Sequence, residues 1–209
     1  MTRRIALVVV LFALSATPLP GQVGLSGFSG GYLPLRNLFD AVRVGGETGP
    51  VIVNLGQEPG VLLGGRLSVR ILSRLGVEVE ASYALSALDL PPTSELTVDD
   101  SNVLLASLNA TWIFFKAPFS PMSLYLSGGF GVAARSGDFW VTFRDTSSFA
   151  GAFGLGLRYG LTPLLFLRFD LRNYVYSFEP TAGAFTFESK TQSDLMATLA
   201  LEFALTPAR

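Results

Sequence analysis

Charged side chains recur two residues apart inside otherwise apolar stretches of this 209-residue chain. The clearest stretch reads LLFLRFDLRNY over residues 164–174 and carries Arg168, Asp170 and Arg172. Side chains two residues apart on a β-strand point to the same side. Guanidinium and carboxylate groups that share a confined side form multiply bonded ion pairs, and Arg suits such pairs better than Lys does. This spacing therefore predicts an ion-pair network.

The same alternation occurs in other parts of the chain, and it predicts a set of charges that share one polar environment. The members of this set are Arg66, Arg70, Glu78, Glu80, Arg158, Arg168, Asp170, Arg172 and Glu202. Five cations and four anions nearly cancel, which favours an interdigitated network. Lysine, the usual cation of a water-exposed surface, occurs only at Lys116 and Lys190.

The composition excludes most catalytic and metal-binding chemistry. The chain has no His and no Cys, so the usual general base, disulfides and thiolate metal ligands are missing. A site without His, built from Asp99, Ser101 and Lys190, is the enzymatic alternative, but no motif supports it. We therefore expect no catalysis, no cofactor and no metal. A net charge of −1 without a basic block also predicts no nucleic-acid partner.

The N-terminal segment has the features of a secretory signal. Arg3 and Arg4 precede the short apolar run 5–13, and small residues and Pro18 and Pro20 follow that run. The apolar run is too short for a membrane-spanning helix. We predict a signal peptide over residues 1–22, cleaved somewhere between 15 and 22, and one exported domain over residues 23–209.

The exported part consists of runs with two-residue alternation, which is the period of a β-strand. Eight runs lie near 23–33, 60–72, 75–87, 102–115, 122–134, 148–160, 164–177 and 193–205. Three connections are short, and the four connections at 34–59, 88–101, 135–147 and 178–192 are longer. Short connections therefore alternate with long ones, which is typical of an up-and-down sheet whose short turns share one end.

The direction of the apolar face decides between two kinds of barrel. An inward apolar face would make a soluble calyx with a charged surface, whereas an outward apolar face suits a lipid-facing wall around a polar lumen. The scarcity of Lys and the predicted ion-pair network favour the lipid-facing wall. Aromatic residues are expected near both membrane interfaces of such a wall. The residues predicted there are Tyr83, Trp112, Phe114, Tyr159 and Tyr174.

The chain resembles the small eight-stranded outer-membrane β-barrels of the outer-membrane protein A and X type, over residues 23–205. The phrases GLGLRYGLTPLLFLRFDLRNY and KTQSDLMATLALEF look like the last hairpin and the closing strand of that family. The fold class predicted is an all-β, eight-stranded antiparallel up-and-down transmembrane barrel with three short periplasmic turns and four longer outer loops. The resemblance also implies contact with outer-membrane lipid, periplasmic chaperones and the barrel-insertion machinery.

The family's closing strand carries an assembly signal, which the resemblance maps onto four positions here. These are Thr198, Ala200, Phe203 and Leu205, with Ala in place of the usual Gly and Leu in place of a terminal aromatic residue. Four further residues follow, whereas the family signal ends at the terminus.

Two functions follow as expectations. The first is a monomeric, non-enzymatic barrel with an occluded, charged lumen, which supports the envelope or binds a surface partner through its long loops. The alternative is a narrow channel or a binding protein for small hydrophobic molecules.

Overall fold

Eight antiparallel strands close into a barrel in which each strand pairs with its neighbours in the sequence and the first pairs with the last. The computed structural model describes residues 22–44, 51–89, 100–144, 146–179, 181–182, 185–186 and 189–205. The barrel strands are β1 (Val23–Pro34), β4 (Gly60–Arg70), β5 (Leu75–Leu85), β7 (Asn102–Lys116), β8 (Met122–Ser136), β10 (Ser147–Gly160), β11 (Leu165–Phe178) and β14 (Lys190–Ala204). The predicted eight-stranded up-and-down barrel is confirmed. Of the predicted signal segment, only Gln22 belongs to the described residues.

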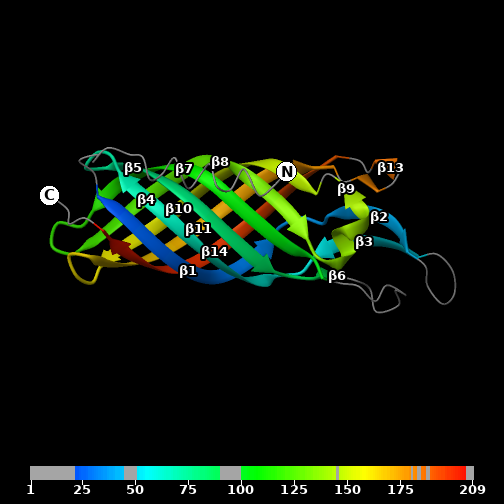
Figure 1. The fold of residues 1–209 in the computed structure, drawn as a ribbon, viewed down its shortest axis with the longest axis horizontal. Helices are drawn as coiled ribbons and strands as arrows, with labels where there is room; N and C mark the ends of the chain where they lie inside the picture. Colours follow the sequence, from blue (N-terminus) through cyan, green and yellow to red (C-terminus); the bar gives the residue numbers. More distant parts are fainter. Residues whose placement is uncertain are drawn as a thin grey trace.

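The two ends of the barrel differ, as Figure 1 shows. Tight turns over 71–74, 117–121 and 161–164 form the short-turn end, at the left of Figure 1. The other end, called here the long-loop end, carries further short elements beyond the barrel. These are β2 (Phe39–Val44), β3 (Val51–Gln57), β6 (Leu88–Asp89), η1 (Asp138–Thr142), β9 (Phe143–Arg144), β12 (Thr181–Ala182) and β13 (Phe185–Thr186).

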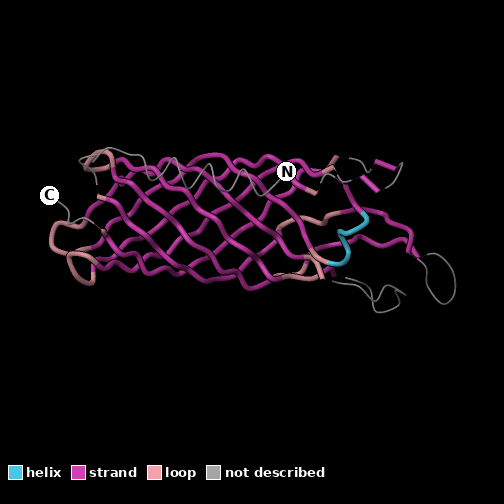
Figure 2. Tube along the Cα trace, in the orientation of Figure 1, coloured by secondary structure: helices cyan, strands magenta, loops and turns pink. Residues whose placement is uncertain are grey.

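Hydrogen-bonded pairs organise these loop elements into small sheets. The β3 strand pairs with both β2 and β6, and β12 pairs with both β9 and β13. The 3-10 turn η1 lies beside them at the long-loop end (Figure 2). Within the described ranges, no helix is long and apolar enough to span a membrane.

Strand alternation sends large apolar side chains outward all around the wall. Exposed examples are Leu25, Leu63, Val79, Leu108, Leu126, Phe153, Leu171 and Leu199, one from each strand. The Gly-rich strand β1, whose faces the sequence does not assign, follows the same rule. Phe28 and Tyr32 are buried inside the barrel, while Leu25 and Leu33 are exposed. The outer surface is therefore apolar over the whole circumference, as a lipid-facing wall requires.

A register shift interrupts this alternation in β7. Ile113 pairs with Tyr125, and Phe115 pairs with Leu124, so Phe114 is an extra residue in its strand. An inserted residue of this kind is a β-bulge, which re-aims the side chains on either side of it. Ile113 is buried, but Phe114 and Phe115 are 37% and 42% exposed. The bulge therefore places two successive aromatic rings on the outer surface near the short-turn end.

Candidate functional site

The predicted charges lie together in the half of the lumen next to the short-turn end. Eight of the nine are at most 8% exposed, namely Arg66, Glu78, Glu80, Arg158, Arg168, Asp170, Arg172 and Glu202. The ninth, Arg70, is half-buried at the edge of the group. Alternation along β4, β5, β10, β11 and β14 points all of these side chains inward, and the barrel closure then brings them within bonding distance. We call these residues, together with Tyr125, the lumen network.

Arg168 is at the centre of the lumen network. Its Nη1 atom lies 2.7 Å from Oε1 of Glu78 and 2.8 Å from Oε2 of Glu202. Its Nε and Nη2 groups donate to the hydroxyl oxygen of Tyr125 at 3.0 and 2.6 Å. Nη2 also lies 3.5 Å from Oδ1 of Asp170. One guanidinium group thus contacts three carboxylates, and this pairing compensates much of the desolvation that its burial imposes.

Arg66 and Arg172 join the same carboxylates from other strands. Arg66 lies 2.5 Å from Glu80 and 2.9 Å from Asp170, and its guanidinium group lies over the ring of Phe28. Arg172 lies 2.8 Å from Glu80. The anions are therefore shared between cations, so the group acts as one connected network.

Several of these ion pairs cross the full width of the barrel. Glu78 and Glu80 belong to β5, whereas Arg168 and Arg172 belong to β11. In the ring of eight strands, β5 and β11 are four positions apart in both directions, so they lie on opposite sides. The 2.7 Å contact between Arg168 and Glu78 and the 2.8 Å contact between Arg172 and Glu80 consequently bridge the lumen.

Tyr125 is a member of the lumen network that the sequence analysis does not identify. Its hydroxyl group donates to Oδ1 of Asp170 and accepts from Arg168. A Cβ atom on Gly156 would lie 2.1 Å from the Tyr125 ring, so this glycine provides the space in which the ring lies against the wall. Tyr125 is hard to assign to a face by its type, because an aromatic ring between Leu124 and Leu126 could also belong to the lipid side. Its placement between Ser123 and Ser127, two polar positions of the same parity, is the available signal.

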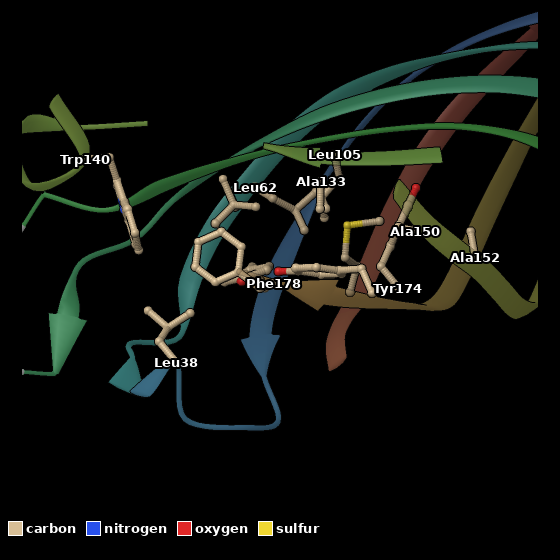
Figure 3. Close-up of a cluster of buried hydrophobic side chains, with 14 of the residues drawn as sticks. Leu38, Leu62, Leu105, Ala133, Trp140, Ala150, Ala152, Tyr174 and Phe178 are labelled. Carbon is tan, nitrogen blue, oxygen red and sulfur yellow. The ribbon is translucent and has the colours of Figure 1, made fainter. Parts of the chain in front are cut away.

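The half of the lumen next to the long-loop end is mainly apolar, which the sequence analysis does not anticipate. Buried side chains from all around the barrel gather there (Figure 3). We call them the outer apolar cluster, and its members are Tyr32, Leu38, Leu62, Val103, Leu105, Ala133, Trp140, Ala150, Tyr174, Phe178 and Met196. The lumen therefore has two layers, an ionic layer and a mainly apolar one that also holds the buried Arg135, Gln192 and Asp194.

Trp140 of η1 covers the outer apolar cluster. Its Nε1 group donates to Oγ of Ser101 at 2.7 Å, and its ring lies 5.5 Å from that of Phe178. The turn begins at Gly137, whose φ of +125° is unfavourable for residues with a side chain. A Cβ atom at Gly137 would also lie 2.3 Å from the carbonyl oxygen of Asp100. Glycine at this position thus allows the loop to fold over the barrel mouth.

Buried polar side chains lie beside Trp140 in the same half of the lumen, namely Arg135, Tyr176 and Asp194. The Arg135 guanidinium group donates to the Tyr176 hydroxyl at 2.7 Å and lies over the Phe178 ring at 5.0 Å. The same Tyr176 hydroxyl group donates to Asp194 at 2.5 Å. Arg135 also forms an ion pair with the buried Asp194, at 3.9 Å. It is therefore held by a hydrogen bond, an ion pair and an aromatic ring.

The interface prediction is wrong for Tyr174. This residue is fully buried in the lumen, where its hydroxyl group lies 2.7 Å from Oγ of Ser107 and 3.4 Å from Glu80. The reason is strand alternation, since Tyr174 is two residues from the inward-pointing Arg172. The other predicted aromatics are exposed on the outer surface: Tyr83 (40%), Trp112 (49%), Phe114 (37%) and Tyr159 (39%).

The predicted assembly signal occupies both faces of β14. Thr198 and Ala200 are buried inside the barrel, whereas Phe203 is exposed to the outside and Leu205 follows at the strand end. Recognition of these residues by the insertion machinery remains a prediction. Within the described part of the chain, no three acidic, His or Cys side chains form a group that could hold a metal ion.

Solved structures of small outer-membrane barrels share this fold. Outer membrane protein AlkL matches with a TM-score of 0.61 at 18% identity, over 93% of this chain and 95% of AlkL. OprG from Pseudomonas aeruginosa and neisserial surface protein A match with TM-scores of 0.56 and 0.55, each at 13% identity, over 88% of this chain and 96% of theirs. No relative among curated proteins matches the sequence.

The sequence itself also matches a family model, and this match agrees with the observed wall and lumen. The model describes the outer membrane protein beta-barrel domain and covers residues 5–203. The expected location in the outer membrane is thereby confirmed. That the short turns lie on the periplasmic side remains a prediction. The chain belongs to the outer membrane protein beta-barrel domain family.

Proposed function

We propose that this protein is a non-enzymatic, non-conducting outer-membrane barrel that supports the envelope and presents its long loops at the cell surface. The observation that carries this proposal is the set of ion pairs between β5 and β11, because they close the lumen from wall to wall. Eight strands leave an interior that side chains just fill. A passing ion would have to separate buried charges that bond to one another.

The outer apolar cluster adds a second barrier of a different kind. An ion that entered from the long-loop end would meet buried apolar side chains such as Leu62 and Leu105 before it reached the lumen network. A charge loses most of its hydration in such surroundings, which is strongly unfavourable. The two layers together favour a plugged barrel over an open pore.

The remaining surfaces suggest where partners act. The wall contacts lipid, and the long-loop end carries the β2–β3 hairpin and η1, which are available to a surface partner. We propose that residues 1–22 direct export, that the single domain is residues 23–209, and that the folded barrel is a monomer. Periplasmic chaperones and the insertion machinery would then act on the unfolded chain, in which the insertion machinery would recognise Phe203 and Leu205 of the predicted assembly signal.

Electrical recording in a planar lipid bilayer tests the absence of conductance. Refolded protein is added to both sides of the membrane, and current is recorded over a range of voltages and salt concentrations. We expect no steady conductance above that of the lipid alone, since both layers of the lumen are filled. Uniform, salt-dependent unitary steps from heat-modifiable, fully folded protein would contradict the proposal.

The outer apolar cluster favours a second candidate, the binding of small apolar molecules beneath Trp140. The chain has two Trp residues, so Trp112→Phe leaves Trp140 as the only indole, and Trp140→Phe leaves the lipid-facing Trp112. We expect 1-bromooctane in micelles to quench Trp112 more than Trp140, because packed side chains bury Trp140. Saturable quenching of Trp140 at lower bromooctane concentrations would instead favour the binding function.

A further inference from the structure

A small pocket opens beside the lumen network at the short-turn end. It has a volume of about 30 Å³, and Arg70, Arg74, Arg158, Arg168, Glu78 and Glu202 supply its charged lining. Arg70 of β4 and Arg158 of β10 come from strands that are four positions apart in the ring, so they approach the pocket from opposite sides. In the predicted orientation, in which the short turns lie in the periplasm, the pocket faces the periplasm.

The lining has more positive than negative charges. Four arginines stand against two glutamates, which leaves an excess of two positive charges. Both glutamates are already bonded to arginines. Glu202 binds Arg158 at 2.7 Å through one oxygen and Arg168 at 2.8 Å through the other, and Glu78 binds Arg168 at 2.7 Å. The excess charge therefore belongs to Arg70 and Arg74.

Arg70 lacks a carboxylate partner among the described residues. Its side-chain hydrogen bond goes to the neutral Oε1 atom of Gln22, at 3.1 Å. The charges of Arg158 and Arg168 act on it unfavourably, and those of Glu202 and Glu78 act on it favourably from beyond ion-pair distance. The Nε2 group of Gln22 is itself buried and has no acceptor within the described structure. Hydrogen-bond donors thus outnumber acceptors at this end of the lumen.

Signal cleavage would increase this imbalance. Gln22 lies at the end of the predicted signal segment, so cleavage on either side of it creates a new α-amino group next to the pocket residue Gly24. That group adds a further cation and further donors. If Gln22 is removed, Arg70 also loses its neutral partner.

The small residues and hydroxyl groups of the lining keep the pocket open and polar. A Cβ atom on Gly24 would lie 2.7 Å from Oγ of Ser68, and one on Gly76 would lie 2.9 Å from Oγ1 of Thr111. The pocket volume exceeds the roughly 10–15 Å³ that a cavity needs to hold one water molecule, but it leaves room for only a few ligand atoms. Only the oxygen atoms at the end of a ligand fit there, and the rest of the ligand would extend into the periplasm.

We propose that this pocket binds a phosphate group from the periplasm, either as inorganic phosphate or as a phosphate monoester. A phosphate dianion matches the excess of two positive charges, whereas a carboxylate supplies one negative charge. Its several oxygens suit Arg guanidinium groups, which bind phosphate through paired N–H donors. The inference does not depend on whether the lumen conducts.

Isothermal titration calorimetry of the folded barrel in octyl glucoside micelles tests the site, since this detergent carries no phosphate. The probes are inorganic phosphate, glycerol 3-phosphate and acetate. The variant Arg70→Gln removes the unpaired cation without breaking an ion pair. The matched control is Arg36→Gln, which removes one positive charge from an exposed residue at the long-loop end. Heat modifiability on a gel verifies that each variant is folded.

We expect saturable phosphate binding that weakens by about tenfold or more in Arg70→Gln and stays unchanged in Arg36→Gln. Equal binding of glycerol 3-phosphate would show that the pocket accepts a phosphate monoester such as a lipid headgroup. Weaker binding of glycerol 3-phosphate would point to free phosphate. The proposal is overturned if folded protein shows no saturable binding, if acetate binds as tightly as phosphate, or if both variants weaken binding equally.

Discussion

Replacement of Arg168 by Leu is expected to lower the free energy of unfolding by about 3–5 kcal/mol, because it leaves buried carboxylates without their shared partner. Arg168 contacts Glu78, Glu202 and Asp170. All three of these carboxylates are at most 4% exposed. Arg66, Arg158 and Arg172 still contact some of these carboxylates. The variant therefore removes the central cation but leaves part of the network in place.

Urea titration of the micelle-embedded barrel, followed by Trp fluorescence, measures this change. The control is Phe169→Leu, an apolar replacement at the adjacent position, whose side chain is 45% exposed on the lipid side. We expect the control to remain near the wild-type unfolding midpoint. A loss below about 1 kcal/mol for Arg168→Leu, the range of exposed ion pairs, would contradict a buried network.

The second large effect concerns the outside of the wall. Leu199 is 53% exposed and lies near the middle of β14, between Ser29 of β1 and Phe169 of β11. Leu199→Arg is expected to destabilise the barrel by about 2–4 kcal/mol, since it places a cation near the midplane of the bilayer. The same urea titration, carried out in lipid bilayers, measures the difference.

The control for Leu199→Arg is the same substitution at a different depth in the bilayer. Leu161 lies in a tight turn at the short-turn end and is 50% exposed, close to the value for Leu199. Leu161→Arg should lower stability by only about 0–1 kcal/mol, because the turn lies near the membrane interface. Equal losses for the two variants would argue against a lipid-facing wall around β14.

The strands and the charged half of the lumen were predictable from local sequence. A two-residue period determines which residues share a face, and the burial of Arg66 and Glu80 follows from that period once the apolar face points outward. Tyr174 shows how a second signal can mislead. Its type suggested a membrane interface, but its spacing from Arg172 placed it in the lumen.

The outer apolar cluster could not be predicted in the same way. Leu62, Leu105 and Met196 occupy inward positions, yet their types resemble those of the lipid-facing residues, so alternation is weak where both faces are apolar. The cover formed by Trp140 depends on the φ of Gly137 and on a hydrogen bond to Ser101, 39 residues away in the sequence. Contacts of this kind arise only from the closed three-dimensional arrangement.

The ion pairs that cross the barrel also constrain how the chain enters the membrane. Arg168 and Glu78 are 90 residues apart, and Arg66 and Asp170 are 104 residues apart. A partly inserted sheet would expose unpaired guanidinium groups to hydrocarbon, which is unfavourable. Strand insertion and ring closure are therefore expected to occur together, in one concerted step. The same coupling should make unfolding slow, since the charges separate only when the ring opens.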